Sequence, residues 1–457
     1  GDVMQALPAA LSRYRDCEVS LFLPLYGTIK QDPSIHLQKI TDFTVFLGWR
    51  EQYVGLFQLK SRAKKKVYFI DNEFYFCRNR IYGEGDDAER FAFYSKAVLA
   101  CIAFLGLDPD IIQCNDWQTA LTPVYLNLYY RHLDKFNHIK TVFTIHNIAY
   151  QGKYGLDILE DTCGIGARDA HVVEYDGCAN FMKGAIECAD KVTTVSPTYA
   201  QEILDPWFSH GLDGLLRQKQ YKLCGILNGI DVDVFNPATD PDIAKNYDAE
   251  TFQEGKAVCK EALQDEFGLH KDGSPVMAMV TRLVGHKGVD LVQAIAEGLL
   301  QQGIELVILG SGEAQYENFF NELCARNPGR VGVYIGFNAK LAQQIYAGAD
   351  IFLMPSRSEP CGLAQMVSCR YGTIPVIRET GGLKDSIHDS GDGYGNGFTF
   401  ANYNAHELYE ACWRAKEGYW QKDGWPVLVK RAMECDFSWS NSAKSYEGLY
   451  NEVVNLW

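Results

Sequence analysis

The sequence has 457 residues and a formal net charge of −15, with 47% hydrophobic and 22% charged residues. This composition excludes a disordered or fibrous chain, and no apolar run reaches the roughly 18 residues of a membrane-spanning helix. The acidic balance and the dispersed basic residues argue against nucleic acid and suit a large neutral ligand such as a polysaccharide. The length exceeds one ordinary core, so we expect two domains.

The first half is predicted to contain buried strands joined by an antiparallel insertion. The apolar runs predict buried strands at 19–24, 110–115, 141–146 and 191–196. Alternating segments separated by turn residues predict the insertion, with strands at 43–49, 53–60 and 66–70. A further strand at 223–227 ends at the turn signal Asn228-Gly229, where we place the domain boundary.

The second half alternates short apolar runs with helical patterns. Strands are predicted at 275–282, 304–310, 331–336, 350–355 and 374–378. Such alternation predicts a parallel, doubly wound sheet with helices on both faces. The expected fold class is therefore α/β, with two Rossmann-like domains, 1–227 and 228–457, facing a cleft that holds the site. We expect the last helix to pack back on the first domain.

The 14 cysteines are scattered without a C-x-x-C pair. Most lie in apolar segments, where free cysteine behaves as a small hydrophobic residue. Zinc-ligand spacing is absent, so we expect no metal and no cofactor. These cysteines indicate a reducing compartment: the cytoplasm, or the plastid stroma in an organism with plastids.

The loop from Ser356 to Leu363 is the strongest local signal for a functional site. It follows a predicted strand and precedes a helical stretch, so backbone N–H groups there face a ligand. Glu359 lies just outside the strand end, in reach of a sugar ring. From its position alone, Glu359 equally suits a purely structural role at the start of the helix.

A second loop, from Thr281 to Gly288, carries two cations five residues apart, Arg282 and Lys287. Together they could neutralise a diphosphate without a metal. The simpler interpretation is that they are two surface cations without a function. Their position at the carboxyl end of a strand, where ligands bind, argues against it. Glycines at two other strand ends could admit a nucleotide or phosphate, namely Gly310 with Gly312, and Gly381 with Gly382 after Thr380.

Two predicted strands of the first half also end in polar residues. Asp116 and Trp117 follow one strand, and His146 and Asn147 follow another. A lone histidine more often packs than reacts, and the Asp-Trp pair equally suits a helix cap with a packed ring. The tryptophan could also stack on a sugar.

Taken together, these stretches resemble the glycogen synthase and starch synthase family of retaining glycosyltransferases, which has the GT-B fold. The residues that carry the resemblance span nearly the whole chain, in the family's order: 115–118, 144–152, 227–231, Arg282 with Lys287, 359–363 and 380–383. The resemblance implies a hexosyltransferase that adds glucose from ADP-glucose to the end of an α-1,4-glucan, with no metal and no membrane. UDP-glucose is the less favoured donor, and glycogen versus starch stays open.

The resemblance also implies roles for single residues. Arg282 and Lys287 would hold the donor diphosphate, and Glu359 would hold the donor glucose. His146 and Asp116 would lie at the sugar and the reaction centre. Further donor contacts would come from Gly310, Gly312, Cys361, Gly362, Leu363, Thr380, Gly381 and Gly382, and further sugar or acceptor contacts from Asp2, Trp117, Asn147 and Asn228.

One part of the family pattern lies outside this sequence. Family members open with a strand and a Lys-containing glycine loop that end in Gly-Asp-Val, and this sequence begins at Gly1-Asp2-Val3. We therefore expect that the strand and the loop lie upstream of residue 1.

Two alternatives stay open at this point. Another sugar-nucleotide transferase of the same fold, of the sucrose or trehalose-phosphate type, would share the architecture. A non-catalytic glucan-binding relative would share it too, although the clustered charges of Arg282, Lys287 and Glu359 argue against it. A nicotinamide dehydrogenase is disfavoured because no G-x-G-x-x-G follows the first strand.

Overall fold

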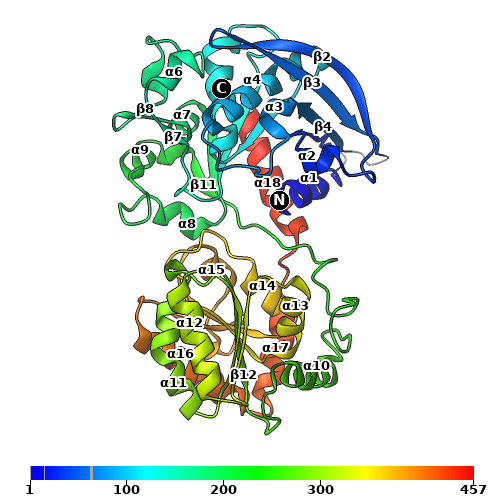
Figure 1. The fold of residues 1–457 in the computed structure, drawn as a ribbon, viewed down its shortest axis with the longest axis vertical. Coiled ribbons are helices and arrows are strands. Elements are labelled where there is room, and N and C mark those ends of the chain that lie inside the picture. The colour runs from blue at the N-terminus through cyan, green and yellow to red at the C-terminus, as the bar shows by residue number, and fades with distance from the viewer. Residues whose placement is uncertain (1, 15, 62–64, 457) are drawn as a thin grey trace. The chain divides into compact units, whose positions relative to one another are not determined.

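The computed structural model describes residues 2–14, 16–61 and 65–456. The chain forms two compact units (Figure 1). The first contains residues 1–195, 200–226 and 442–457, and the second contains 196–199 and 227–441. Within the described residues, no helix is long and apolar enough to cross a membrane.

The first unit contains a four-stranded sheet in the order β11-β10-β6-β5, and all its strand pairs are parallel. The buried runs that predict strands in this half form three of its members, and the segment before Asn228 forms the fourth. The bounds are β5 (Ile111–Asn115), β6 (Lys140–Ile145), β10 (Lys191–Thr194) and β11 (Leu223–Gly225).

A second sheet in this unit has the order β1-β4-β3-β2. The buried strand predicted at 19–24 is β1, and it belongs to this second sheet because it pairs in parallel with β4 of the insertion. A buried strand has the same apolar sequence in either sheet, so local pattern does not identify its partner. The bounds are β1 (Ser20–Pro24), β2 (Leu37–Leu47), β3 (Arg50–Leu59) and β4 (Lys66–Asp71).

Helices and a small three-stranded sheet complete the first unit. The long helix α4 (Asp87–Leu105) contributes many of its buried side chains. The small sheet consists of β7 (Lys153–Tyr154), β8 (Glu174–Tyr175) and β9 (Cys178–Asn180). The other helices are α1 (Asp2–Leu11), α2 (Gly27–Lys30), α3 (Glu73–Phe76), α5 (Leu121–Tyr125), α6 (Ile158–Asp161), α7 (Phe181–Cys188), α8 (Pro197–Glu202) and α9 (Asp213–Gln218).

The second unit is a six-stranded parallel sheet in the order β14-β13-β12-β15-β16-β17. The chain runs outward from β12 in one direction and then outward from β15 in the other, which is the doubly wound 3-2-1-4-5-6 order. Five strands match the predicted runs. The bounds are β12 (Val276–Val280), β13 (Glu305–Gly310), β14 (Val331–Ile335), β15 (Ile351–Met354), β16 (Ile374–Arg378) and β17 (Phe398–Phe400).

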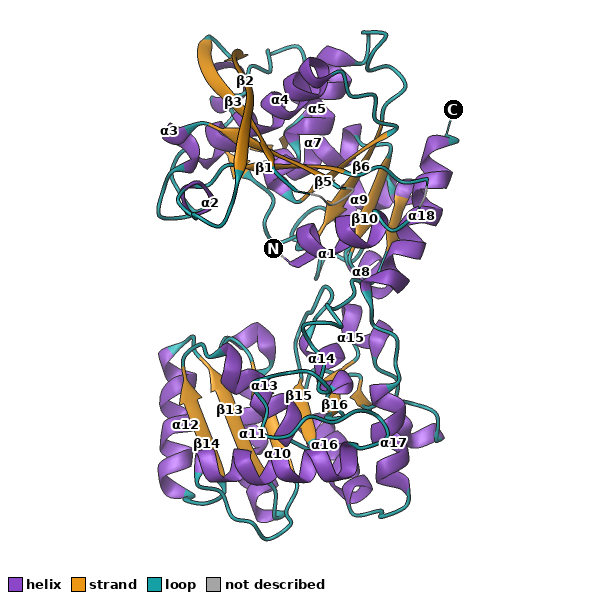
Figure 2. Cartoon of the chain, turned by 90° about the vertical axis from the view of Figure 1, so that its right-hand side faces the viewer, coloured by secondary structure: helices purple, strands orange, loops and turns teal. Residues whose placement is uncertain are grey.

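Helices cover both faces of this sheet. In Figure 1, α11, α12 and α16 lie on one side of β12, and α10, α13 and α17 lie on the other. Figure 2 shows the strands side by side between these layers. The bounds are α10 (Phe252–Phe267), α11 (Val289–Gln301), α12 (Ala314–Arg326), α13 (Ala339–Gly348), α14 (Ala364–Arg370), α15 (Gly381–Ser386), α16 (Ala405–Tyr419) and α17 (Gly424–Met433).

The last helix, α18 (Trp439–Val454), begins in the second unit, and its residues from Ser442 onward belong to the first. Two side chains anchor it there. Tyr450 Oη hydrogen-bonds Gln113 on β5, and Lys191 Nζ on β10 lies 2.6 Å from Glu452 Oε1.

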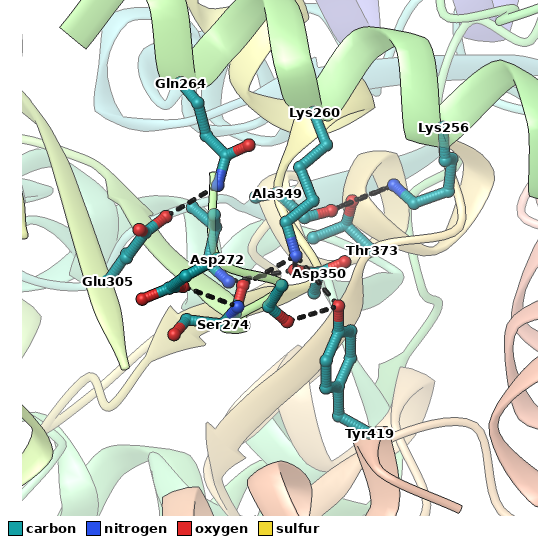
Figure 3. A network of polar contacts seen from close by, with 12 residues as sticks. Lys256, Lys260, Gln264, Asp272, Ser274, Glu305, Ala349, Asp350, Thr373 and Tyr419 are labelled. Atoms are coloured by element: carbon teal, nitrogen blue, oxygen red, sulfur yellow. Dashed lines mark hydrogen bonds and ion pairs between the residues drawn. The ribbon is translucent and has the colours of Figure 1, made fainter. Parts of the chain in front are cut away.

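A polar network closes the amino ends of the second sheet (Figure 3). Lys256, Lys260 and Gln264 repeat every four residues, so they project from one face of α10. The Lys256 ammonium donates to Ala347 O, Ala349 O and Thr373 Oγ1, each at 2.9 Å, and to Tyr371 O at 3.2 Å. Lys260 lies 2.6 Å from Asp350 Oδ2. These bonds fix the helix to the strand starts and leave the carboxyl ends free for a site.

This network predicts the cost of removing one cation. Lys256→Met removes four hydrogen bonds to buried oxygens and leaves Ala349 O and Tyr371 O with only their bonds from Thr373 Oγ1 and Tyr247 Oη. We therefore expect it to lower the free energy of unfolding by about 3 kcal/mol. Lys271→Met, which removes an exposed ion pair with Asp265, should cost less than about 1 kcal/mol. Urea denaturation of both variants measures the difference, and equal midpoints would contradict the assigned role.

Candidate functional site

The carboxyl ends of β12 and β15 lie side by side at the point where the strand order of the second sheet reverses. In open α/β sheets, ligands bind in the crevice at such a switch point. The two loops that leave it, 281–288 and 355–363, are the two charged motifs of the sequence. The topology therefore brings Lys287 and Glu359 together across 72 residues of chain.

Lys287 and Glu359 form a largely buried ion pair. Lys287 Nζ lies 2.7 Å from Glu359 Oε2, and their side chains are 18% and 10% exposed. Ser356 Oγ donates to the same oxygen at 3.0 Å. No hydrogen bond from the described residues reaches Glu359 Oε1, so this oxygen can accept from a ligand hydroxyl. A carboxylate oxygen that accepts from both an ammonium and a hydroxyl is held in one position.

The other charged groups of the first loop face outward. Arg282 is exposed, and so is His286. Partial desolvation of the imidazole lowers the pKa of His286, and the neighbouring Lys287 and Arg282 cations lower it further. The imidazole is therefore neutral near pH 7, and the positive charge of this loop resides on Arg282 and Lys287.

The glycines at the strand ends are needed for contact between loops. A Cβ at Gly310 would lie 1.8 Å from Thr281 O, and one at Gly312 would lie 2.3 Å from Leu283 O. Likewise, a Cβ at Gly381 would lie 2.0 Å from Glu359 O, and one at Gly382 would lie 2.1 Å from Cys361 O. These glycines therefore let the loops after β13 and β16 pack directly against the two charged loops.

Tyr403, between β17 and α16, ties the two charged loops together. Its hydroxyl donates to Gly285 O at 3.3 Å and hydrogen-bonds the Asp290 carboxylate. The Arg357 guanidinium carbon lies 4.5 Å from the centre of its ring. Arg357 N also donates to His286 O at 2.9 Å. We call Tyr403, Asp290 and Arg357 the brace, because they hold the backbone on both sides of Lys287 and Glu359.

Asn228 and Cys361 lie in the second unit beside Glu359. The backbone N–H of Asn228 hydrogen-bonds the Cys361 sulfur, and burial raises the pKa of that thiol to about 12. Cys361 therefore stays protonated and unreactive. Within the described residues, the buried Oδ1 of Asn228 and Oε1 of Gln365 have no hydrogen-bond partner. The structure thus places Asn228 next to the predicted donor loop, although we had grouped it with the acceptor-side residues.

The carboxyl ends of β5 and β6 bring Asp116 and His146 together in the first unit. Asp116 Oδ1 accepts from His146 N at 2.8 Å, and His146 Nε2 lies 2.9 Å from Asn115 Oδ1. Asp116 has a φ of 55°, which is unfavourable for a residue with a side chain. Burial raises the pKa of its carboxyl. A strained, desolvated carboxylate that orients a histidine loop is typical of a functional site.

The structure gives the other predicted residues of this unit packing or turn contacts. Trp117 is buried, and its ring meets those of Phe91 at 5.2 Å, Tyr154 at 6.1 Å and Phe181 at 6.5 Å. Its contacts are those of a core residue. Asn147 Oδ1 accepts from Ala149 N at 2.9 Å and closes a turn. Asp2 begins α1, and its side chain lies outside the described residues.

Two aromatic residues at the carboxyl edge were not predicted from the sequence. Tyr403 follows the three-residue strand β17, which is too short to give a recognisable sequence pattern. Phe337 follows β14, and it is 90% exposed. Its neighbour Gly336 donates to Gly310 O at 3.0 Å, so Phe337 stands next to the loop after β13. In the sequence, the available signal was a phenylalanine directly after the strand predicted at 331–336.

Comparison with known proteins identifies the family. A model of the starch synthase catalytic domain matches residues 1–218, and one of glycosyl transferases group 1 matches 261–419. The chain is 44% identical to a glycogen synthase of Geobacillus thermodenitrificans over 458 residues, which cover 99% of this chain and 94% of the relative. A glycogen synthase of Clostridium novyi is 44% identical over 465 residues, covering 100% and 96%. This chain belongs to the glycogen and starch synthase family.

A solved structure agrees with this assignment. The catalytic domain of starch synthase IV from Arabidopsis thaliana, bound to ADP and acarbose, superposes with a TM-score of 0.88 at 34% identity, covering 100% of this chain and 96% of that one. A sucrose-phosphate synthase from Thermosynechococcus elongatus, with a TM-score of 0.59 and 16% identity over 98% and 91% of the two chains, shares the fold. As a glycogen or starch synthase, the protein is a GT-B hexosyltransferase.

The brace makes a prediction for this synthase. Tyr403→Ala removes both the ring under Arg357 and the hydroxyl, so the two charged loops lose their common support. We expect transferase activity to fall at least about tenfold, while Tyr403→Phe, which keeps the ring, should lose less. Tyr394→Ala, at an 85% exposed position, is the control. Initial-rate assays measure all three, and full activity of Tyr403→Ala would show that the brace is dispensable.

Proposed function

We propose that the protein transfers glucose from ADP-glucose to the non-reducing end of an α-1,4-glucan, with retention of anomeric configuration. The observation that carries the proposal is the buried Lys287–Glu359 pair at the switch point of the second sheet. It puts a cation for a diphosphate and an acceptor for sugar hydroxyls side by side. The ADP bound to the Arabidopsis relative supports an adenine nucleotide as the donor.

The donor diphosphate would bind to Arg282 and Lys287. Arg282 is exposed and offers a planar fork of donors, which suits phosphate oxygens. Lys287 would leave part of its contact with Glu359 to neutralise the charge that develops as the nucleotide departs. Two cations with the backbone groups of 361–363 supply this stabilisation without a metal.

The donor glucose and the nucleobase would bind on either side of the diphosphate. Glu359 Oε1 has room to accept from a glucose hydroxyl, and Cys361, Gly362 and Leu363 follow it in the same loop. The Thr380 to Gly382 segment packs beneath that loop. At the other end, the exposed ring of Phe337 beside the loop of Gly310 and Gly312 suits stacking on adenine.

His146 and Asp116 would act on the sugar side of the reaction. The desolvated Asp116 carboxylate accepts the His146 backbone N–H and thus orients the imidazole. Retention would follow if the acceptor hydroxyl attacks the anomeric carbon on the face that the diphosphate leaves. The C–O bond to phosphate breaks, the new C–O bond to the acceptor forms, and the departing phosphate oxygen takes the acceptor's proton. Free cysteines throughout the chain favour a cytoplasmic location.

A transfer assay tests the proposal directly. ADP-glucose and UDP-glucose are supplied separately to the protein, with maltooligosaccharide as acceptor. We expect elongation mainly from ADP-glucose and an α-linked product by NMR. Elongation from neither donor would reject the proposed reaction, and preference for UDP-glucose would reject the proposed donor.

Breaking the ion pair at Glu359 should affect ADP affinity and transfer rate in opposite directions. Glu359→Gln keeps an acceptor for Ser356 but removes the charge that holds Lys287. We therefore expect ADP to bind at least as tightly as in the wild type, while the transfer rate falls about 100-fold or more.

Lys287→Met is the matched change on the other partner, and it should weaken ADP binding at least about tenfold. Calorimetry with ADP and initial rates measure both variants. Loss of ADP affinity in Glu359→Gln equal to that in Lys287→Met would contradict the division of roles.

A further inference from the structure

Trp49 is an exposed aromatic residue that the structure nevertheless holds in place. It lies at the tip of the β2–β3 hairpin, and it is 74% exposed. Its Nε1–H donates to Asp161 Oδ1 at 2.7 Å, and the Arg50 guanidinium carbon lies 4.7 Å from the ring centre. An exposed side chain gains little stability from such fixing, so the fixed ring points to a ligand.

The backbone under this ring is equally constrained. Gly48 has a φ of +59°, and a Cβ there would lie 2.2 Å from Asp161 O. A Cβ at Gly164 would lie 2.9 Å from Gly48 N. Arg50 donates to Asp161 O at 2.6 Å and to Asp161 Oδ2 at 2.9 Å. The hairpin tip is therefore packed closely against the end of α6 and the loop that follows it (Figure 1), and Trp49 stands on a rigid base.

The chemistry around the ring indicates the class of ligand. An open aromatic face bordered by a carboxylate and a guanidinium offers stacking for sugar C–H groups and hydrogen bonds for sugar hydroxyls. A polyanion is disfavoured by the net charge of −15. A protein partner is disfavoured because the side chains in contact with the ring, Arg50 and Asp161, are charged.

We propose that Trp49, Arg50 and Asp161 form a surface site that binds a segment of an α-1,4-glucan chain. The inference rests on the proposed function, because the glucan is the acceptor of that reaction. The site is made of different residues from those proposed for transfer. A chain held at Trp49 stays on the enzyme between transfers, which raises the local concentration of acceptor ends.

Affinity electrophoresis in native gels with increasing glycogen tests the site without any need for activity. Trp49→Ala should raise the dissociation constant for glycogen about tenfold, the size expected for one stacked ring. Trp49→Phe keeps a ring and should retain most of the affinity, so it separates stacking from a folding defect. Trp413→Ala, at a 48% exposed tryptophan on α16, is the control. Unchanged retardation of Trp49→Ala, or an equal loss in Trp413→Ala, would overturn the inference.

Transfer assays distinguish this inference from the proposed function. With saturating ADP-glucose and a short maltooligosaccharide, Trp49→Ala should work within about twofold of the wild type, while its KM for glycogen rises about tenfold. If the wild type transfers nothing, the proposed reaction fails, and electrophoresis still decides on the site. If the wild type transfers and Trp49→Ala binds glycogen normally, the surface site alone is rejected.

Discussion

The Lys287–Glu359 ion pair is the interaction on which the rest of the donor unit depends. A charge pair that is mostly withdrawn from water costs free energy unless its geometry is well held. The surrounding structure supplies that geometry through Ser356, through the brace around Tyr403, and through glycines that let four loops pack without side chains between them. The amino ends of the same strands are closed by the α10 lysines, so binding groups gather at the carboxyl ends alone.

The pair also explains how one site can serve two ligand groups. Without donor, the cation and the carboxylate satisfy each other. A diphosphate competes for Lys287, and a glucose hydroxyl competes for Glu359, so binding exchanges one buried contact for two. Such a site avoids an unpaired buried charge in either state, and it needs preorganised loops, which the brace supplies.

Much of the second unit could be predicted from its sequence. Its five longer strands are buried runs separated by helical periods, and parallel topology then sends the 281–288 and 355–363 loops to one edge. The three-residue β17 was too short to produce a pattern, so Tyr403 behind it was not found. The brace joins Tyr403 to Gly285 across 118 residues, a contact that no local spacing encodes. Similarly, the partner of β1 is set by a pairing across the fold.

The roles of single residues were also only partly predictable from the sequence. Trp117 follows a strand end, where a ring that stacks on a sugar is plausible. In the structure, its ring packs in the core against Phe91 and Phe181. The glycines at 310 and 381 suggested room for phosphate, and the structure adds a packing requirement that the sequence did not reveal. Trp49 carried no motif at all, and only its fixed contacts with Asp161 and Arg50 mark it as a site.

Calorimetric titration of ADP into the wild type and into Glu359→Gln measures whether the carboxylate and the phosphate compete for Lys287. Removing the carboxylate's charge should free Lys287 and leave the ADP affinity equal to or greater than that of the wild type. A marked loss of ADP affinity in Glu359→Gln would contradict it, because Lys287 would then depend on Glu359 to hold the phosphate and would not be shared between them.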